Sequence, residues 1–583
     1  MKRINFKPSI LVIAAAVVLS GCSGLNKMKK NADQINFKVT PEVLEAHAGE
    51  VDVAITGRFP EKYFNKKVTL TATPVLKYES GETKYQPVTV QGESVQANNK
   101  VISYNGGSVS YKDATAFSKD MSKSELYVNI TAAQGSKSVD FAPIKVADGV
   151  IATSEKVVMM PKPILGVVRE ANNSGKYDPS VDAFQRVVPD EMKADIMYLI
   201  NRSNVRKEET EKSSVKDLEA YTKKASDDSR VDLKDVEISA YASPDGSIDL
   251  NTELAAERKN TSSAFLAKKL KEAGVDIELK TKYTPEDWEG FKEKMEQSNI
   301  QDKELILRVL SMYNDPEVRE REIRNLSETF TEVADEILPQ LRRAKMVTSV
   351  DLIGKTDEEL KAAAMDDPAS LNEAELLYAA TLFSDLNDQL TVYKSFVKVY
   401  PNDWRGPNNV GYVLAKQFKY ADAKPNFEKA ESLKNNEPVV KNNLGAIALT
   451  EGDVAKAEGL LGAAAGSGEE VNYNLGLVSI KKAEYDKAVR YFSKYSDPNS
   501  GLAKLLAGDN NGALKDLEAC EIPNCYMSEY FKAVVGARTA KDNLLFESLK
   551  TACDINPKLK DVAKVDMEFA KYFNDPKFKA IVD

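Results

Sequence analysis

The sequence predicts a multidomain protein with three folded parts: an antiparallel β-sandwich over residues 36–160, a central α/β domain with a helical insert over 182–354, and an all-α solenoid over 371–583. Three observations support this division. Apolar and polar residues alternate with period two in the first part, strand and helix patterns alternate in the second, and glycine-centred helical repeats fill the third. The chain has 583 residues, which is too many for a single domain.

The first 21 residues have the pattern of a signal peptide. A basic start precedes an apolar run from Ile10 to Leu19, which is too short to cross a bilayer as a helix. The run ends in Leu19-Ser20-Gly21-Cys22, which resembles a bacterial lipobox. The resemblance implies cleavage before Cys22 and acylation of that cysteine, with palmitate as the expected type of chain. Residues 22–35 are then expected to form a tether, and the chain to be anchored to a membrane without spanning it.

The residues after the cysteine bear on location. Ser23 rather than Asp follows Cys22, which favours the outer membrane by resemblance to enterobacterial sorting rules. The next residues are basic, whereas surface lipoproteins of Bacteroides-like bacteria usually carry acidic residues there. The periplasmic face is therefore favoured over the cell surface.

The net charge and the histidine content exclude several classes of function. The net charge is −9, and removing the leader takes away three positive charges, which leaves the mature chain near −12. This acidic balance argues against nucleic acid as a partner. His47 is the single histidine, so a Ser-His-Asp triad can form only around it and a His-rich zinc site is excluded. His47 lies before a predicted strand, where a structural or solvent-exposed role is favoured over catalysis. We expect no cofactor.

Three cysteines follow Cys22: Cys520, Cys525 and Cys553. Cys520 and Cys525 are close in sequence, and an oxidising periplasm permits a disulfide between them. The alternative is that these residues are free thiols that pack as small apolar side chains.

The first folded part shows strict alternation. Val51, Val53 and Ile55 alternate with Asp52, Ala54 and Thr56, and later runs repeat the pattern between glycine-containing turns. Several short strands at this spacing are typical of an antiparallel sandwich. The segment is interpreted as an immunoglobulin-like spacer or docking module.

The central part carries a motif on the turn between a strand and a helix. Residues 240–247 read Ala-Tyr-Ala-Ser-Pro-Asp-Gly-Ser, and Asn251, Leu254 and Arg258 follow on a helix predicted to end before Gly274. This resembles the OmpA-like C-terminal domain, whose pattern is Gly-His-Thr-Asp-x-x-Gly-Ser followed by Asn, Leu and Arg. The resemblance implies binding of the diaminopimelate of peptidoglycan, with the arginine on its carboxylate.

The motif departs from the family at its acidic position. The family's Asp falls on Ser243, and Asp245 lies two residues further along. The resemblance therefore gives Ser243, Asp245, Asn251 and Arg258 as a candidate peptidoglycan site. The alternative is an OmpA-like fold that has lost its ligand and keeps Arg258 as a surface ion-pair partner. Residues 284–340 are predicted to be a charged helical insert, similar to inserts in a group of OmpA-family proteins of Bacteroides-like bacteria.

The last part contains in-register repeats. An alanine stands twelve residues after each of four glycines, and a large apolar residue stands sixteen after each glycine. The triplets are Gly411–Ala423–Phe427, Gly445–Ala457–Leu461, Gly476–Ala488–Phe492 and Gly501–Ala513–Leu517. The pattern resembles tetratricopeptide repeats, in which small residues let two antiparallel helices pack closely. The alternative is a non-repeating helical bundle.

Asparagines near these glycines are candidates for a peptide groove. Repeats of this type bind peptides along a concave face, and an asparagine side chain can both donate to and accept from a peptide backbone. The candidates are Asn409, Asn442, Asn443, Asn472 and Asn474. Surface asparagines without a partner are the alternative.

Together these features predict a non-enzymatic, membrane-anchored scaffold in the periplasm. Its repeats are expected to dock partner proteins, in outer-membrane protein assembly or transport. The alternative is a structural tether that links the outer membrane to peptidoglycan through the OmpA-like domain. An enzyme that uses carboxylates is a third hypothesis, because acidic residues are abundant.

Overall fold

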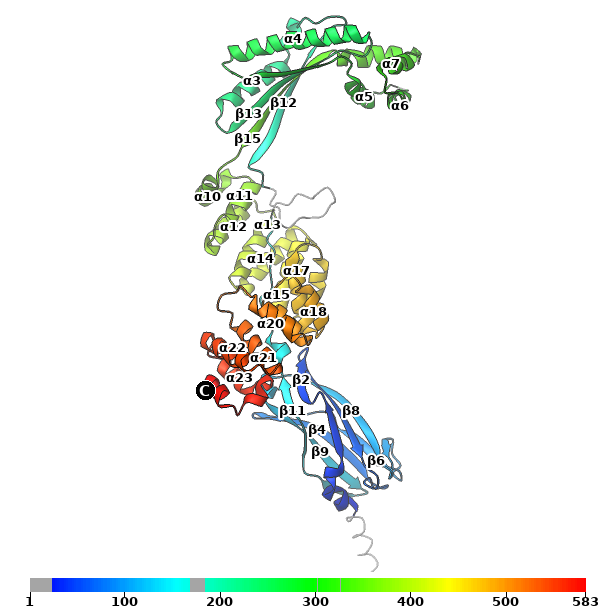
Figure 1. Cartoon of the computed structure of the whole chain (residues 1–583), viewed down its shortest axis with the longest axis vertical. Helices are drawn as coiled ribbons and strands as arrows, with labels where there is room; N and C mark the ends of the chain where they lie inside the picture. The colour runs from blue at the N-terminus through cyan, green and yellow to red at the C-terminus, as the bar shows by residue number, and fades with distance from the viewer. Residues whose placement is uncertain (1–23, 168–183, 301, 326) are drawn as a thin grey trace, which may run out of the picture. The chain divides into compact units, whose positions relative to one another are not determined.

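The computed structural model describes residues 24–167, 184–300, 302–325 and 327–583, so the predicted signal peptide and Cys22 lie outside the described residues. The chain divides into two compact units (Figure 1). The first comprises Met1–Asp182 and Phe383–Asp583, and the second comprises Ala183–Leu382. In sequence, the second unit is therefore an insertion into the first.

The first unit begins with a β-domain (residues 24–151). Alternation of buried and exposed residues along its strands confirms the period-two pattern, and Val51, Val53 and Ile55 point into its core. Its strands are β1 (Asn36–Thr40), β2 (Val43–His47), β3 (Glu50–Phe59), β4 (Thr69–Tyr78), β5 (Gly81–Lys84), β6 (Val88–Gly92), β7 (Lys100–Ile102), β8 (Gly107–Ala116), β9 (Ser124–Gln134), β10 (Lys137–Asp140) and β11 (Ile144–Ile151).

The pairing of these strands is mixed, which corrects the expectation of a purely antiparallel sandwich. Most neighbours run antiparallel, but β11 pairs with β2 in parallel, and so does β7 with β6. Strand β11 lies between β2 and β9, and it runs parallel to β2 but antiparallel to β9. The result is a single mixed set of eleven paired strands.

The tether expected over residues 22–35 is replaced by packed structure from its third residue onward. Residues 24–30 are helical, and a short 3-10 helix follows at Ala32–Gln34. Leu25 and Met28 are buried in the core of the β-domain, and the Tyr63 hydroxyl donates to the Met28 carbonyl at 3.0 Å. The two apolar residues are three apart, so one face of this otherwise basic helix faces the core.

The solenoid closes the first unit with stacked helical hairpins. Its helices are α12 (Leu386–Val399), α13 (Arg405–Lys416), α14 (Tyr420–Leu433), α15 (Pro438–Thr450), α16 (Val454–Ala463), α17 (Glu469–Lys481), α18 (Tyr485–Tyr491), α19 (Pro498–Leu506), α20 (Asn510–Glu518), α21 (Tyr526–Arg538), α22 (Asp542–Ile555), α23 (Leu559–Val565), the 3-10 helix η6 (Met567–Tyr572) and α24 (Pro576–Val582).

Contacts at the repeat glycines confirm the repeat pattern. A Cβ atom on Gly411 would lie 2.7 Å from the Phe427 ring, and one on Gly445 would lie 2.8 Å from Leu461. Gly476 meets Phe492 and Gly501 meets Leu517 in the same way. The small and large residues therefore face each other across each hairpin, and this leaves no room for a side chain at the glycine.

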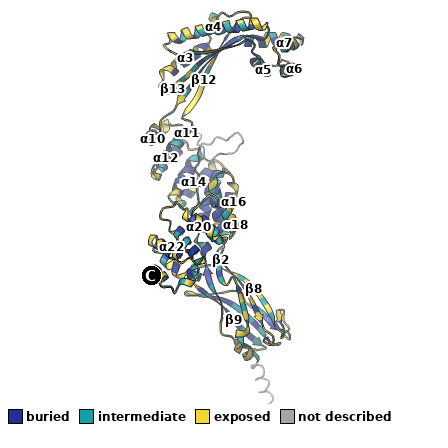
Figure 2. Cartoon of the chain, in the orientation of Figure 1, coloured by how far each residue is buried: buried dark blue, intermediate teal, exposed yellow. Residues whose placement is uncertain are grey.

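The second unit is an α/β domain with a four-stranded sheet in the order β12-β15-β13-β14. Its elements are β12 (Val187–Met197), α2 (Lys207–Thr210), α3 (Ser213–Asp227), β13 (Val231–Tyr241), α4 (Ile248–Glu272), β14 (Leu279–Thr284), α5 (Trp288–Gln297), α6 (Lys303–Met312), α7 (Pro316–Arg324), α8 (Ser327–Glu332), a π-helical turn (Val333–Ile337), α9 (Leu338–Leu341), β15 (Arg343–Ile353), α10 (Asp357–Asp366) and α11 (Glu373–Thr381). Figure 2 shows that the start of β12 is exposed.

Two features predicted for this unit are present. Helix α4 ends where expected, with Gly274 in a left-handed conformation at φ +81°. The residues expected as an insert form α5 to α9 and have a hydrophobic core of their own. The solenoid, expected from residue 371, belongs to the first unit only from Phe383, because α10 and α11 lie in the second unit. Among the described residues, no helix is both long and apolar enough to cross a membrane.

Candidate functional site: an asparagine ladder

Residues 157–167, here called the strap, leave the β-domain and run along the solenoid. Figure 1 shows this cyan stretch of chain among the yellow and orange helices. The strap has no regular secondary structure. Its backbone is held instead by asparagine side chains from α13, α15, α17 and α19 (Asn408, Asn409, Asn442, Asn443, Asn474 and Asn499), which we call the ladder face.

Four asparagine Oδ1 atoms accept hydrogen bonds from strap amides. The Gly166 amide donates to Asn409 at 2.7 Å, Ile164 to Asn443 at 2.6 Å, Lys162 to Asn474 at 2.7 Å and Val158 to Asn499 at 2.9 Å. Each of these asparagines also returns a bond from Nδ2 to the carbonyl of the same strap residue, at 2.7–2.9 Å. Lys162, Ile164 and Gly166 alternate along the strap, and alternate residues of an extended chain face the same way.

The asparagines are also bonded to one another. Asn443 accepts from Ile164 and from Asn442, and it donates to the Ile164 carbonyl and to Asn408. All of its hydrogen-bonding capacity is therefore used inside the protein. Asn474 continues the chain of bonds by donating to Asn442 at 2.9 Å. The ladder residues are at most 1% exposed, and a buried polar network is stable only when it is satisfied in this way.

Two side chains of the strap occupy specific positions. Ile164 is 3% exposed and packs among Val439, Ala464 and Val471. The Lys162 ammonium lies 4.5 Å from the ring centre of Tyr473 and 4.9 Å from that of Tyr495, a two-ring cation–π site. Burial raises the pKa of both tyrosines, that of Tyr495 to about 12, so both rings carry neutral phenols at neutral pH.

A third position of the strap, Gly166, is tight for any side chain. A Cβ atom on Gly166 would lie 3.1 Å from Asn409 Oδ1, 3.2 Å from Asn408 Nδ2 and 3.2 Å from the Trp404 ring. A larger residue would push apart the ladder atoms that hold this end of the strap. The ladder face thus binds the main chain of the strap at four residues, and its surroundings fit the side chains, or the lack of one, at Lys162, Ile164 and Gly166.

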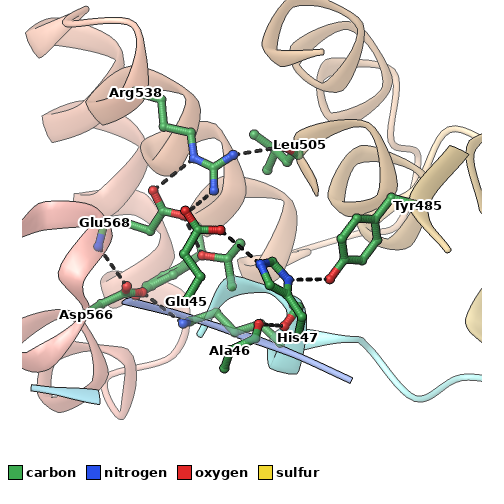
Figure 3. A network of polar contacts seen from close by, with 12 residues as sticks. Glu45, Ala46, His47, Tyr485, Leu505, Arg538, Asp566 and Glu568 are labelled. Atoms are coloured by element: carbon green, nitrogen blue, oxygen red, sulfur yellow. Dashed lines mark hydrogen bonds and ion pairs between the residues drawn. The ribbon is translucent and has the colours of Figure 1, made fainter. Parts of the chain in front are cut away.

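A polar network at the junction with the β-domain fixes the chain just before the strap (Figure 3). Lys156 pairs with the buried Asp566 at 3.0 Å, and the Thr153 hydroxyl donates to Glu568. Arg538 binds the same Glu568 and donates to the Leu505 carbonyl at 2.8 Å. The β-domain and solenoid are therefore joined by ion pairs at the strap's entry.

His47 belongs to this junction and has a structural position. Its Nε2 donates to Glu45 at 3.0 Å, and its Nδ1 lies 2.6 Å from the Tyr485 hydroxyl of α18. The hydrogen bond from His47 is the main cause that holds the pKa of Glu45 below its ordinary value. Figure 3 shows the histidine between the two partners.

Four of the five asparagines predicted to line a groove lie in the ladder: Asn409, Asn442, Asn443 and Asn474. Asn472 does not. Its side chain bonds to Glu469 at 3.2 Å, away from the strap. Asn408 and Asn499 were missed. The ladder asparagines that accept from strap amides each stand two residues before a repeat glycine, and this register would have found Asn499 and rejected Asn472.

The candidate peptidoglycan residues lie at the start of α4 in the second unit. Ser243 bonds to Asp245, and Arg342 pairs with Asp245 at 2.9 Å and donates to Ser243 Oγ at 3.1 Å. Asn251 donates to the Gly246 carbonyl at 3.0 Å. The carboxylate of Asp245 is thus already neutralised within the domain.

Arg258 is turned into the domain core. It is 1% exposed, and its guanidinium donates to three backbone carbonyls, those of Leu199, Arg202 and Tyr241. Burial lowers the pKa of Arg258 to about 10, so it stays charged at neutral pH. The expectation of a surface ion pair at Arg258 is therefore wrong, and a ligand carboxylate would have to replace carbonyl partners to reach it.

The three later cysteines are free thiols, so the Cys520–Cys525 disulfide is not formed. Cys553 is buried, while Cys520 and Cys525 are half-buried, and burial raises the pKa of the Cys525 thiol. Within the part of the chain that the structure describes, no cluster of three or more His, Cys, Asp or Glu residues is arranged to hold a metal ion.

No protein-family model matches the chain, and no curated protein matches it. Solved structures of repeat proteins do match. A tetratricopeptide repeat protein from Parabacteroides merdae is 15% identical, with 42% of this chain and 98% of that one covered and a TM-score of 0.28. YrrB, a TPR protein with an unusual peptide-binding site, is 18% identical (31% and 97% covered, TM-score 0.24), and yeast Tom70 is 12% identical (57% and 87% covered, TM-score 0.25). The description of the solenoid as stacked helical hairpins rests on its own helices and glycine contacts and not on these matches.

Proposed function

We propose that the protein is a membrane-anchored, non-enzymatic adaptor whose solenoid docks partner proteins in extended form. One observation carries this proposal: the ladder face binds main-chain N–H and C=O groups of an extended segment in pairs. Such bonds are available from any extended polypeptide, so the face suits protein ligands. Amide side chains bind without transferring protons at physiological pH, which fits docking better than acid–base chemistry.

The anchor is the second part of the proposal. Acylation of Cys22 would place the lipid two residues before Gly24, where packed structure begins. At about 3.5 Å per residue, the β-domain would then lie against the membrane and not at the end of a long tether. Lys27, Lys62, Lys66 and Lys67 line a cavity of about 610 Å³ beside Gly24, with Glu61 as its one acidic lining residue, although the whole chain is acidic. This basic end suits the anionic headgroups of a bilayer.

The docking role is tested by site-specific photo-crosslinking in native membranes. A photoreactive aromatic residue replaces Tyr495, whose ring lies 4.9 Å from the Lys162 ammonium beside the ladder, and in a matched protein it replaces Gly459, whose Cβ position on α16 faces open space. The proposal expects protein adducts at position 495 and few at position 459. Absence of adducts at 495, or equal labelling at both positions, would contradict docking at the ladder face.

The peptidoglycan tether remains the alternative function of the second unit. Ser243, Asp245 and Asn251 gather at one end of α4, as the motif implies, which is the observation in its favour. Sedimentation with purified peptidoglycan tests it, comparing the wild-type chain with Asp245→Ala. Binding that the substitution reduces would support the tether, and a wild-type chain that stays in the supernatant would exclude it.

A further inference from the structure

The strap shows which sequences the ladder face accepts. Main-chain bonds are made at Val158, Lys162, Ile164 and Gly166, whereas Pro161 and Pro163 stand between bonded residues. Proline has no amide hydrogen and favours an extended backbone, so at those two positions it loses no bond and reduces the entropy lost on binding. The segment therefore has the pattern Pro-Lys-Pro-Ile-x-Gly, and each named residue has a structural reason.

Displacing the strap from the ladder face would break no helix and no sheet. It belongs to no helix or sheet, and among the described residues its backbone bonds go to asparagine side chains except for one bond from the Met160 amide to Val158. A second extended segment would satisfy the same asparagines one for one. The exchange therefore leaves no ladder amide unpaired, which is the main cost of emptying a buried polar site.

We infer that the ladder face is a selective receptor for extended partner segments with a Pro-Lys-Pro-aliphatic-x-Gly pattern, and that the strap is a resident competitor that such a segment displaces. This inference rests on the proposed docking function and adds its partner chemistry and its regulation. Lys162 and Ile164 supply the selectivity, through the Tyr473–Tyr495 pair and the pocket around Val439 and Val471. The strap lowers the fraction of chains that are open to a partner, and this weakens apparent affinity in proportion.

The test uses the purified full chain and a fluorescein-labelled peptide of residues 156–167. Ile164→Asp in the protein weakens the strap and leaves every ladder residue intact. The peptide is expected to bind this variant at least about tenfold more tightly than wild type. Adding Asn443→Ala to the variant should abolish that gain, and a peptide carrying Ile164→Asp should not bind. A folded Ile164→Asp protein that binds the peptide no better than wild type overturns the inference.

A second measurement decides the question if Ile164→Asp fails to fold. Saturating peptide is added to the wild-type chain, and hydrogen exchange of its own strap amides is followed by mass spectrometry, with the Ile164→Asp peptide as control. Faster exchange at Ile164 and Gly166 with the matching peptide alone supports displacement, and unchanged exchange overturns it. Neither assay involves a cellular partner, so failure of the docking function would appear only in the crosslinking experiment.

Discussion

The Ile164 amide donates to Asn443 Oδ1 at 2.6 Å, and Asn443 Nδ2 donates back to the Ile164 carbonyl at 2.8 Å, although the residues are 279 apart in sequence. One side-chain amide thereby supplies both partners that a neighbouring strand would give to an extended chain. The relationship repeats at three other asparagines. It joins the solenoid to the segment that leaves the β-domain, so the two form one unit.

Replacing Asn443 by alanine should destabilise the solenoid. The change removes the partners of two buried groups, the Ile164 amide and Asn408 Oδ1, while the Ile164 carbonyl keeps its bond from Asn408 Nδ2. The expected cost is about 2–4 kcal/mol in the free energy of unfolding. Trp404 packs beside Ile164, so its fluorescence in a Trp288→Phe background reports urea unfolding at this site. Asn472→Ala is the matched control and should change the free energy of unfolding by less than about 0.5 kcal/mol. Equal effects of the two substitutions would remove the special role of the ladder.

Two glycine-to-alanine substitutions should change the stability of the solenoid in opposite directions. At Gly476, the new Cβ would lie 2.6 Å from the Phe492 ring, and overpacking of this kind costs about 1–3 kcal/mol. At Gly459, within α16, nothing lies within 4 Å, so alanine should stabilise the helix by about 0.5–1 kcal/mol. Thermal unfolding of both variants checks the prediction. A stabilised Gly476→Ala protein would refute the close hairpin contact.

The junction at Glu45 should contribute stability that acid removes. Because the folded-state pKa of Glu45 lies below its ordinary value of 4.5, the stabilisation is fully present above that value and is lost as pH falls through the lowered pKa. The Glu45 side chain is 40% exposed, so screening limits the contribution to at most about 1 kcal/mol. Unfolding of wild type and Glu45→Gln, compared from about pH 6 to pH 3, should show a difference that shrinks on acidification. A difference independent of pH would contradict the assignment.

The basic end of the β-domain should bind anionic membranes even without the lipid. The chain from residue 23 is expected to co-sediment with phosphatidylglycerol vesicles and not with phosphatidylcholine vesicles. Reversing the charge of Lys66 and Lys67 should weaken binding by about tenfold or more, and added salt should weaken it further. The control reverses Lys223 and Lys224, which lie in the second unit. If both double variants bind alike, the basic end has no membrane role.

Local patterns were sufficient to predict most of the architecture. The glycine–alanine–large triplets predicted the hairpins because the residues that touch are close in sequence. The asparagines were predicted to bind a backbone because they stand near those glycines. Asn472 was misassigned because proximity was used instead of register: it stands four residues before Gly476, and the ladder position is two before.

Local patterns could not predict that the strap binds to the ladder, or that two strand pairs run parallel. The strap lies hundreds of residues before the asparagines that hold it, and no local periodicity marks that pairing. The same holds for β2 and β11, whose direction depends on pairing with distant strands. In the segment after Cys22, the lysines suggested a solvated tether, and the three-residue spacing of Leu25 and Met28 was the available signal of a packed helix.

Hydrogen–deuterium exchange of the strap in the intact chain tests the central claim most directly. If the ladder holds the strap, the amides of Val158, Lys162, Ile164 and Gly166 should exchange at least about a hundredfold more slowly than in a free peptide of the same sequence, and Asn443→Ala should speed up exchange at Ile164 most. Exchange of these four amides at the rate of the free peptide would contradict the account.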